Sequence, residues 1–301
     1  MNEISIAVAI ATTGRPEVLS QTLAELARQS RLPDRVAVCP AKPGDFDAQG
    51  ATGLPFQVEV VKSPDIGLTI QRNALIRSLE DVEVIIFFDD DFFPNINFIQ
   101  QCFDIFSRNE DIVVATGKVL ADGATGPGIS PDEARTIIAN DMAANPLDKL
   151  SETLGPASNG YGCNMALRAS VIRREHLRFD ESLPLYGWQE DVDFCIALSR
   201  YGRQVRSERC RGVHLATKGG RNSGVKFGYS QIANPVHIWR KGNMQAGRAV
   251  VQITRNIASN FVRSAWPEPW VDRRGRLRGN FLAAADLIRG RLTPQNIKQL
   301  S

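Results

Sequence analysis

Short apolar runs alternate with amphipathic segments along the first two thirds of the chain. Within the runs, polar and apolar side chains do not alternate, which is typical of strands buried on both faces of a sheet. The runs cover residues 4–11, 35–39, 56–61, 84–88 and 112–116, and further regular structure is expected at 164–171, 203–207 and 211–215. This pattern predicts an α/β fold with a mostly parallel central sheet flanked by helices.

The intervening segments have the spacing of amphipathic helices. Leu19, Leu23 and Leu26 fall on one face behind Pro16, a residue favoured in the first helical turn. Further helices are expected over 68–79, 96–107, 131–144 and 191–201, and two more over about 244–263 and 277–292. The Gly- and Lys/Arg-rich segment 217–228 is expected to be a mobile loop. We therefore expect a sheet domain over residues 1–228 and a C-terminal helical appendage over 229–301.

The composition is that of an ordinary globular protein, with 301 residues, 43% hydrophobic and 23% charged. The five cysteines are widely spaced and form no CxxC pair, which argues against a disulfide framework or a zinc finger. The N-terminus lacks the basic segment of a signal peptide, and no apolar run approaches the ~18 residues of a membrane span. We expect a cytoplasmic protein, either soluble or peripheral on the cytoplasmic face of the inner membrane.

The formal net charge of +3 conceals a division along the chain. Residues 1–199 hold 16 basic and 29 acidic side chains, a net of −13, whereas residues 200–301 hold 20 and 4, a net of +16. On a helical wheel the C-terminal helices carry arginines beside two apolar stripes, Val250/Ile253/Ile257/Phe261 and Leu277/Phe281/Ile288/Leu292. These helices either pack on the sheet domain or contact anionic lipid. No nucleic-acid-binding motif accompanies the charge, so no nucleic-acid partner is expected.

Three consecutive aspartates, Asp89, Asp90 and Asp91, follow the apolar run 84–88. Ligands of such sheets bind beyond the carboxyl ends of the strands, and neighbouring carboxylates repel one another unless a cation neutralises them. The run therefore predicts a site for Mg²⁺ or Mn²⁺; a solvated acidic turn that caps the next helix is the alternative. His214 is similarly either a metal ligand or a packed, hydrogen-bonded histidine.

A second acidic group, Glu190, Asp191 and Asp193, lies at the start of an expected helix. Carboxylates are common there because the helix dipole favours them, and a desolvated carboxylate beside an aromatic residue can also act as a general base. The Gly- and cation-rich segment 218–226 either folds over a diphosphate or is a solvated loop. These residues alone leave both questions open.

Taken together, these motifs resemble a family of enzymes, the family 2 glycosyltransferases of the GT-A fold. These enzymes are inverting and use nucleotide sugars. The resemblance covers about residues 4–215: its matching segments, in order, are 8–16, 67–74, the DxD-like Asp89–Asp91 with Pro94, 162–168, 179–181, 190–193 and His214. Two segments depart from the family pattern. Thr12-Thr13 replaces the commoner Thr-Tyr/Phe-Asn, and residues 40–47 lack the usual acidic loop.

The resemblance implies a role for each matching residue. Asp89, Asp91 and His214 would hold Mn²⁺ or Mg²⁺ on a donor diphosphate, with the donor half at about 1–118 and the acceptor half at about 158–216. Asp191 would deprotonate an acceptor hydroxyl and Glu190 would position the acceptor. The other donor-binding residues would be Thr12, Arg15, Arg72, Asp89, Asp90, Lys218 and Arg221, and the other acceptor-binding residues would be Asn164 and Trp188, although Trp188 is equally compatible with a core position.

The implied reaction moves a sugar from a nucleoside-diphosphate sugar, expected to be a UDP-sugar, to a saccharide hydroxyl. The acceptor would be free or lipid-linked and would belong to polysaccharide or exopolysaccharide biosynthesis. A sugar-nucleotide nucleotidyltransferase would instead carry a Gly-rich loop and a lysine after the first strand, which Ala11–Arg15 do not supply. A haloacid-type phosphatase would place its DxD motif on the first strand. A non-catalytic membrane- or nucleic-acid-binding protein would leave the carboxylates unexplained.

Overall fold

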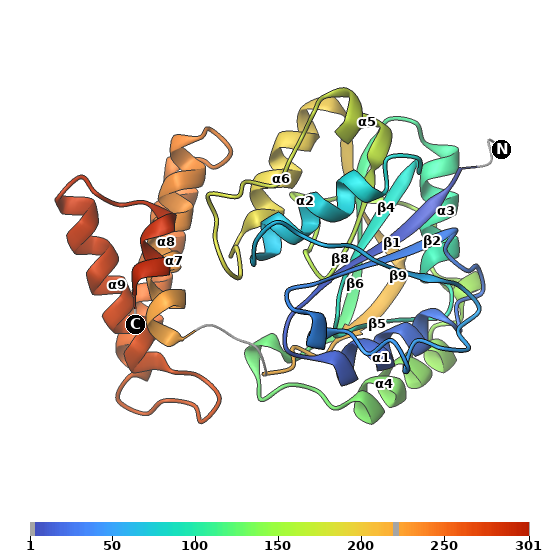
Figure 1. Ribbon diagram of the computed structural model, residues 1–301, viewed down its shortest axis with the longest axis horizontal. Coiled ribbons are helices and arrows are strands. Elements are labelled where there is room, and N and C mark those ends of the chain that lie inside the picture. Colours follow the sequence, from blue (N-terminus) through green and yellow to red (C-terminus); the bar gives the residue numbers. More distant parts are fainter. Residues whose placement is uncertain (1–3, 219–222, 301) are drawn as a thin grey trace. The chain divides into compact units, whose positions relative to one another are not determined.

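The computed structural model describes residues 4–218 and 223–300, which divide into two compact units (Figure 1). The first unit contains the described residues of 1–66, 70–178 and 198–220. The second contains 67–69, 179–197 and the described residues of 221–301. The domain boundary expected at residue 228 stays a prediction.

A single sheet in the order β3-β2-β1-β4-β8-β6-β9-β5 forms the centre of the first unit, and β7 pairs with β9. β1 runs parallel to β2 and β4, whereas β8 runs antiparallel to β4 and β6, so the sheet is mixed. The strands are β1 (Ile6–Thr12), β2 (Arg35–Pro40), β3 (Val58–Val60), β4 (Val84–Asp89), β5 (Phe92–Pro94), β6 (Ile112–Asp122), β7 (Gly155–Pro156), β8 (Asn164–Arg168) and β9 (Arg203–His214). The expected α/β class with a central sheet is confirmed. The expected pair of short strands at 203–207 and 211–215 is wrong, because β9 is continuous.

Helices cover the sheet through the apolar faces that their spacing predicts. Alternate residues of β1, including Val8 and Ile10, join one buried cluster with Leu19 and Leu23 of α1 and Phe98 of α3. Each such buried side chain contributes on the order of 1.5–3 kcal/mol. The helices are α1 (Pro16–Leu26), α2 (Leu68–Ser78), α3 (Phe98–Arg108), α4 (Pro131–Ala144) and α5 (Ala169–Arg174), with 3₁₀ turns at Pro43–Asp45, Gly123–Thr125, Leu147–Lys149 and Ser199–Tyr201.

The second unit is helical, with α6 (Glu190–Leu198), α7 (Gly224–Arg240), α8 (Ala246–Arg263), α9 (Arg273–Ile288) and the 3₁₀ segment Pro294–Gln299. The expectation of a loop through residue 228 is wrong for its described end. Ser223 caps α7 by accepting a hydrogen bond from Lys226 N, so the helix begins inside that segment. α7 and α9 cross closely, since a Cβ at Gly228 would overlap the carbonyl oxygen of Arg276. Within the described ranges, no helix is both long and apolar enough to cross a bilayer.

An ionic network ties α6 to the end of α7 in the second unit. Asp180 accepts hydrogen bonds from Nε2 of His237 at 2.9 Å and from Nζ of Lys241 at 2.8 Å. The same ammonium group lies 2.6 Å from Oδ2 of Asp193, whose Oδ1 accepts from Asn243 Nδ2 at 2.7 Å. The bonds from His237 and Lys241 outweigh burial and hold the pKa of Asp180 well below its ordinary value of 3.8.

Replacing Asp180 with asparagine is expected to lower the free energy of unfolding of the second unit by about 2 kcal/mol at neutral pH. Because the folded pKa lies below the unfolded one, the contribution is present above the unfolded pKa and is lost as the pH falls towards the folded pKa. The gap between wild type and variant should therefore narrow between about pH 5 and pH 2. Denaturant unfolding followed by tryptophan fluorescence measures it, since the chain's four tryptophans, at 188, 239, 266 and 270, all lie in this unit.

The matched control is Asp148→Asn, which changes an exposed aspartate of the first unit and should leave that transition unmoved. A gap between wild type and the Asp180 variant that is constant or grows on acidification would contradict the assignment of this network.

Candidate active site

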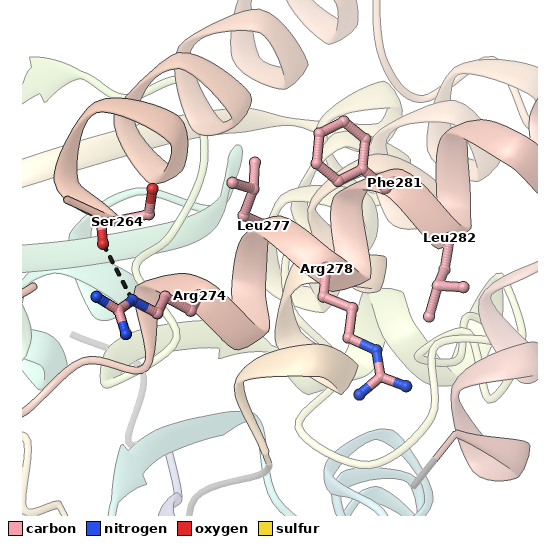
Figure 2. A pocket seen from close by; sticks show the side chains of 6 residues that line it. All are labelled: Ser264, Arg274, Leu277, Arg278, Phe281 and Leu282. Carbon is pink, nitrogen blue, oxygen red and sulfur yellow. Dashed lines mark hydrogen bonds between the residues drawn. The ribbon is translucent and has the colours of Figure 1, made fainter.

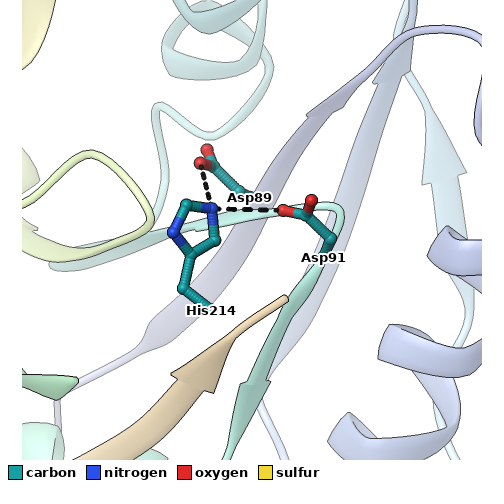
Figure 3. Close-up of side chains that lie close together, drawn as sticks. All are labelled: Asp89, Asp91 and His214. Atoms are coloured by element: carbon teal, nitrogen blue, oxygen red, sulfur yellow. Dashed lines mark ion pairs between the residues drawn. The ribbon is translucent and has the colours of Figure 1, made fainter. Parts of the chain in front are cut away.

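Strand ends of the first unit bring the metal-ligand candidates together. β4 ends at Asp89, and Asp91 immediately precedes β5. β5 pairs antiparallel with β9 so that Phe92 lies opposite His214, which places the histidine beside the aspartates (Figure 3). β6 runs parallel to β9 on its other side and sets Asp122 opposite His214.

The three candidate ligands point towards one another (Figure 3). One ligand atom from each of Asp89, Asp91 and His214 lies within 4.8 Å of the others. His214 Nε2 is 3.8 Å from Oδ2 of Asp89 and 3.5 Å from Oδ1 of Asp91. Two carboxylates and an imidazole are a donor set that suits Mn²⁺ and is compatible with Mg²⁺. The residues therefore fit the metal ion that the sequence predicts.

Two residues behind the histidine were missed by the sequence interpretation. The other ring nitrogen of His214, Nδ1, lies 2.9 Å from Oδ1 of Asp122, and Tyr161 donates its hydroxyl to Oδ2 of the same carboxylate at 2.7 Å. The Tyr161 ring also meets the imidazole edge-on at 6.0 Å. A carboxylate in this position fixes the ring orientation of a metal-binding histidine. The sequence offered no signal for this position beyond the acidic residue at 122 itself. The predicted strand ended at residue 116, too early to place that residue beside His214.

The carboxylates and the imidazole of this site shift one another's pKa values. Burial disfavours a charged imidazole, but the carboxylates of Asp122 and Asp91 outweigh burial and raise the pKa of His214 to about 10. Burial alone would raise the pKa of Asp91, whereas His214 and Arg15 together hold it below its ordinary value. Burial alone would also raise the pKa of Asp122, but the charge and bond of His214 and the bonds from Ala124 N and Tyr161 together lower it to about 2. Metal binding here is therefore coupled to release of the imidazole proton.

Asp90, the middle aspartate, is completely buried and does not belong to the group of three candidate ligands. Its Oδ2 accepts a hydrogen bond from the Thr12 hydroxyl at 2.6 Å, and Arg15 Nη2 lies 2.5 Å from its Oδ1. Its main-chain carbonyl accepts from Thr22 at 2.7 Å. Burial raises the pKa of Asp90 to about 7, against the opposing charge of Arg15. This geometry makes Asp90 and Thr12 supports of the turn that presents Asp89 and Asp91.

Two arginines expected on the donor side contact the acidic turn. Arg15 Nη1 lies 2.7 Å from Oδ2 of Asp91 and donates to the carbonyl oxygen of Thr217 at 3.3 Å. Arg72, only 2% exposed, contacts Asp89 at 3.3 Å and donates to the carbonyl oxygen of Gly162 at 2.9 Å. Both guanidinium groups therefore lie beside the carboxylates that would hold the metal ion of a donor diphosphate.

The first unit contains further residues that the sequence predicts for the site. Asn164 is buried at the start of β8, where its Oδ1 accepts from the Thr116 hydroxyl at 2.7 Å. Lys218 donates from Nζ to the carbonyl oxygen of Gly123 at 3.1 Å. Arg221 lies outside the described residues.

The second unit carries the expected acceptor-side residues at the start of α6. Glu190 is buried and Asp191 is half-buried, and both belong to the first helical turn. Leu185, Gly187 and Gln189 all have positive φ, from 59° to 73°, just before it. Such a conformation is costly for leucine and glutamine, and strained backbone of this kind clusters at functional sites.

Asp193 and Trp188, on either side of Asp191, have different neighbours. Asp193 is 1% exposed and held by Lys241 and Asn243, so it anchors the helix. Trp188 is half-buried, with its ring centroid 5.7 Å from that of Phe227.

The chain belongs to a known enzyme family. The model of glycosyl transferase family 2 matches residues 7–174, more than half of the chain. The protein is therefore a glycosyltransferase with the GT-A fold. No curated protein sequence matches it.

Solved structures show the same fold at low identity. S. aureus TarS, residues 1–349, superposes with a TM-score of 0.56 at 14% identity, over 99% of this chain and 83% of that one. Mannosyltransferase PcManGT from Pyrobaculum calidifontis, solved with GDP-Man and Mn²⁺, gives 0.57 at 12% identity, over 96% and 80%. GalNAc-T7 with UDP, GalNAc and Mn²⁺ gives 0.57 at 12%, but the chain spans only 56% of that protein.

Proposed function

We propose that the protein is a metal-dependent inverting glycosyltransferase that uses a nucleoside-diphosphate sugar, with a UDP-sugar as the expected donor. The observation that carries the proposal is the convergence of Asp89, Asp91 and His214 at the strand ends of a family 2 chain. Similar folds solved with UDP-GlcNAc, in TarS, and with GDP-Man, in PcManGT, support the donor class. The acceptor is a saccharide hydroxyl, free or lipid-linked, in polysaccharide biosynthesis.

On the donor side, Asp89, Asp91 and His214 would hold Mn²⁺ or Mg²⁺. The bound ion offsets the negative charge that develops on the leaving nucleoside diphosphate. Asp122 keeps the imidazole of His214 oriented, and Asp90 with Thr12 keeps the acidic turn in place. Arg15 and Arg72 exchange their carboxylate contacts for the donor phosphates, which guanidinium groups bind well.

On the acceptor side, Asp191 acts as the general base and Glu190 positions the acceptor. The carboxylate of Asp191 takes the proton of the acceptor hydroxyl while that oxygen bonds to the anomeric carbon and the bond to the diphosphate breaks. A single displacement of this kind inverts the anomeric configuration. The position of Asp191 supports the role, because its side chain lies in the first turn of α6 and is partly exposed, as a base that meets an acceptor hydroxyl must be.

A thermal-shift screen tests the donor class. UDP-glucose, UDP-GlcNAc and GDP-mannose are added to the full chain with and without Mn²⁺, and nucleoside-diphosphate release is then followed with candidate acceptors. A donor at about 100 times its Kd should stabilise the protein by about 2.7 kcal/mol. The shift should need the ion, and it should vanish with EDTA. If no nucleotide sugar raises the melting temperature in either condition, the proposed function is wrong.

A further inference from the structure

Large apolar side chains are exposed on two helices of the second unit. On α8 and just after it, Phe261 and Trp266 are 66% and 86% exposed, and on α9 Phe281 and Ile288 are 63% and 87% exposed. Monomeric soluble proteins rarely expose such large apolar side chains together. Of the two stripes considered in the sequence analysis, each therefore has members that are exposed, Phe261 in one and Phe281 and Ile288 in the other.

We call the exposed side of these two helices, together with Trp266, the α8–α9 face. An open groove of about 410 Å³ is lined by Ser264 at the end of α8 together with Arg274, Leu277, Arg278, Phe281 and Leu282 of α9 (Figure 2). Arg274 donates from Nε to the carbonyl oxygen of Ser264 at 3.2 Å and joins the two helices. The exposed Ile288 ends α9 on the same helical face as Phe281 and is followed by Arg289, and the exposed Phe261 and Val262 lie in the last turn of α8, which Trp266 follows.

α9 packs within the second unit through the side that lies opposite Phe281 and Ile288. Gly279, Asn280 and Ala283 are buried on the opposite side of the helix. There Asn280 Nδ2 donates to the carbonyl oxygen of Gly228 at 2.7 Å, and a Cβ at Gly279 would overlap the carbonyl oxygen of Val225. Phe281 and Ile288 are therefore not needed for the core of this unit.

The charge around the face is strongly positive. Residues 223–300 contain thirteen basic and three acidic side chains. Each acidic group is engaged within the unit: Glu268 pairs with Arg263 and Arg273, Asp272 caps α9, and Asp286 accepts from the Tyr229 hydroxyl. Among the described residues, no ion pair involves Arg248, Arg255, Arg278, Arg289 or Arg291. These arginines therefore make the surface positively charged and can bind an external anion.

We propose that the α8–α9 face binds the surface of an anionic lipid bilayer. Phe281, Ile288 and Trp266 insert at the level of the headgroups, and arginines such as Arg278 and Arg289 contact lipid phosphates. A second copy of this chain is the poorer occupant, because two-fold pairing would set these arginines against the same arginines with no acidic partner. The binding needs neither donor nor metal. Only the interpretation of this binding, namely that the acceptor is presented at a membrane, rests on the proposed function.

Vesicle flotation of the full chain tests the proposal. The protein should bind phosphatidylcholine vesicles that contain about 30% phosphatidylglycerol at low salt, bind pure phosphatidylcholine much less, and dissociate at about 0.5 M salt. Tryptophan emission should shift to shorter wavelength on binding. The double variant Arg278→Glu/Arg289→Glu should lose about tenfold or more in affinity. The matched control is Arg108→Glu, an exposed arginine at the end of α3, which should bind as wild type does.

Three results would overturn the proposal. The first is no binding to the anionic vesicles at low salt, and the second is an equal loss in the Arg108 control. The third is a stable dimer in light scattering that the Arg278/Arg289 variant dissociates, which would assign the face to a second copy. Donor-induced thermal shifts measured on the same variant remain at the wild-type value if only membrane binding fails. A failure of the proposed glycosyl transfer would remove those shifts in the wild type as well.

Discussion

The Asp191→Asn variant should lose sugar transfer by a factor of about 10² to 10⁴, the usual contribution of a general base. The amide cannot take the proton from the acceptor hydroxyl, yet it has nearly the same size as the carboxylate. Donor binding resides in the first unit and should therefore be retained. Nucleoside-diphosphate release with acceptor measures the first effect, and the Mn²⁺-dependent thermal shift with donor measures the second.

Asp193→Asn provides the comparison within the same helical turn. Asp193 is held by Lys241 and Asn243, so its replacement should lower the stability of the second unit, seen by tryptophan fluorescence, more than it lowers turnover per folded molecule. Near-normal turnover in the Asp191 variant would refute the assignment of the base. Equal stability losses in the two variants would refute the distinction between a reacting and an anchoring carboxylate.

Replacing Asp91 with asparagine should remove tight Mn²⁺ binding and, with it, transfer. The residue supplies one of two carboxylates in a three-residue ligand group and lies 3.5 Å from the imidazole of His214. Asp122→Asn should have a smaller effect, about 10–100-fold in Mn²⁺ affinity, because it removes only the group that orients the histidine. Electron paramagnetic resonance of free Mn²⁺ measures both affinities without any substrate.

Asp132→Asn, at a highly exposed side chain on α4, is the control for this series and should bind Mn²⁺ as wild type does. The relative losses of Mn²⁺ affinity in the Asp91 and Asp122 variants distinguish a metal ligand from a supporting residue. If Asp122→Asn weakened Mn²⁺ binding as much as Asp91→Asn, then Asp122 would be a ligand and not a support. If neither variant changed the affinity, the metal site would lie elsewhere.

Much of the first unit could be predicted because its information is local. Buried strands that are covered on both faces appear as uninterrupted apolar runs, and the acidic turn directly follows one of them. The placement of His214 opposite Phe92, and of Asp122 opposite His214, could not be read this way. It depends on register between strands far apart in the sequence, and the antiparallel insertion of β8 between β4 and β6 has no local signal either.

The second unit was harder to predict for a different reason. α9 buries Gly279, Asn280 and Ala283, which are small or polar, and exposes Phe281 and Ile288. Close helix approach and amide hydrogen bonds stabilise this contact, and an analysis of hydrophobic spacing detects neither. The same bias towards apolar periodicity hid α7, whose first turn contains glycine and lysine. The family motifs did identify the acidic residues of α6, but not the ionic network behind Asp193.

One irregularity in the sheet has a consequence for how such proteins diverge. Between Val119 and Ala121, β6 contains one residue, Leu120, that has no partner on β9, and this extra residue brings Asp122 level with His214. If β6 and β9 paired regularly through this point, Ala121 would lie opposite His214 and the carboxylate of Asp122 would lie one position further along, although every functional side chain would remain in the chain. Loss or gain of a metal requirement can therefore arise from the register of two strands, which a comparison of motif letters does not detect.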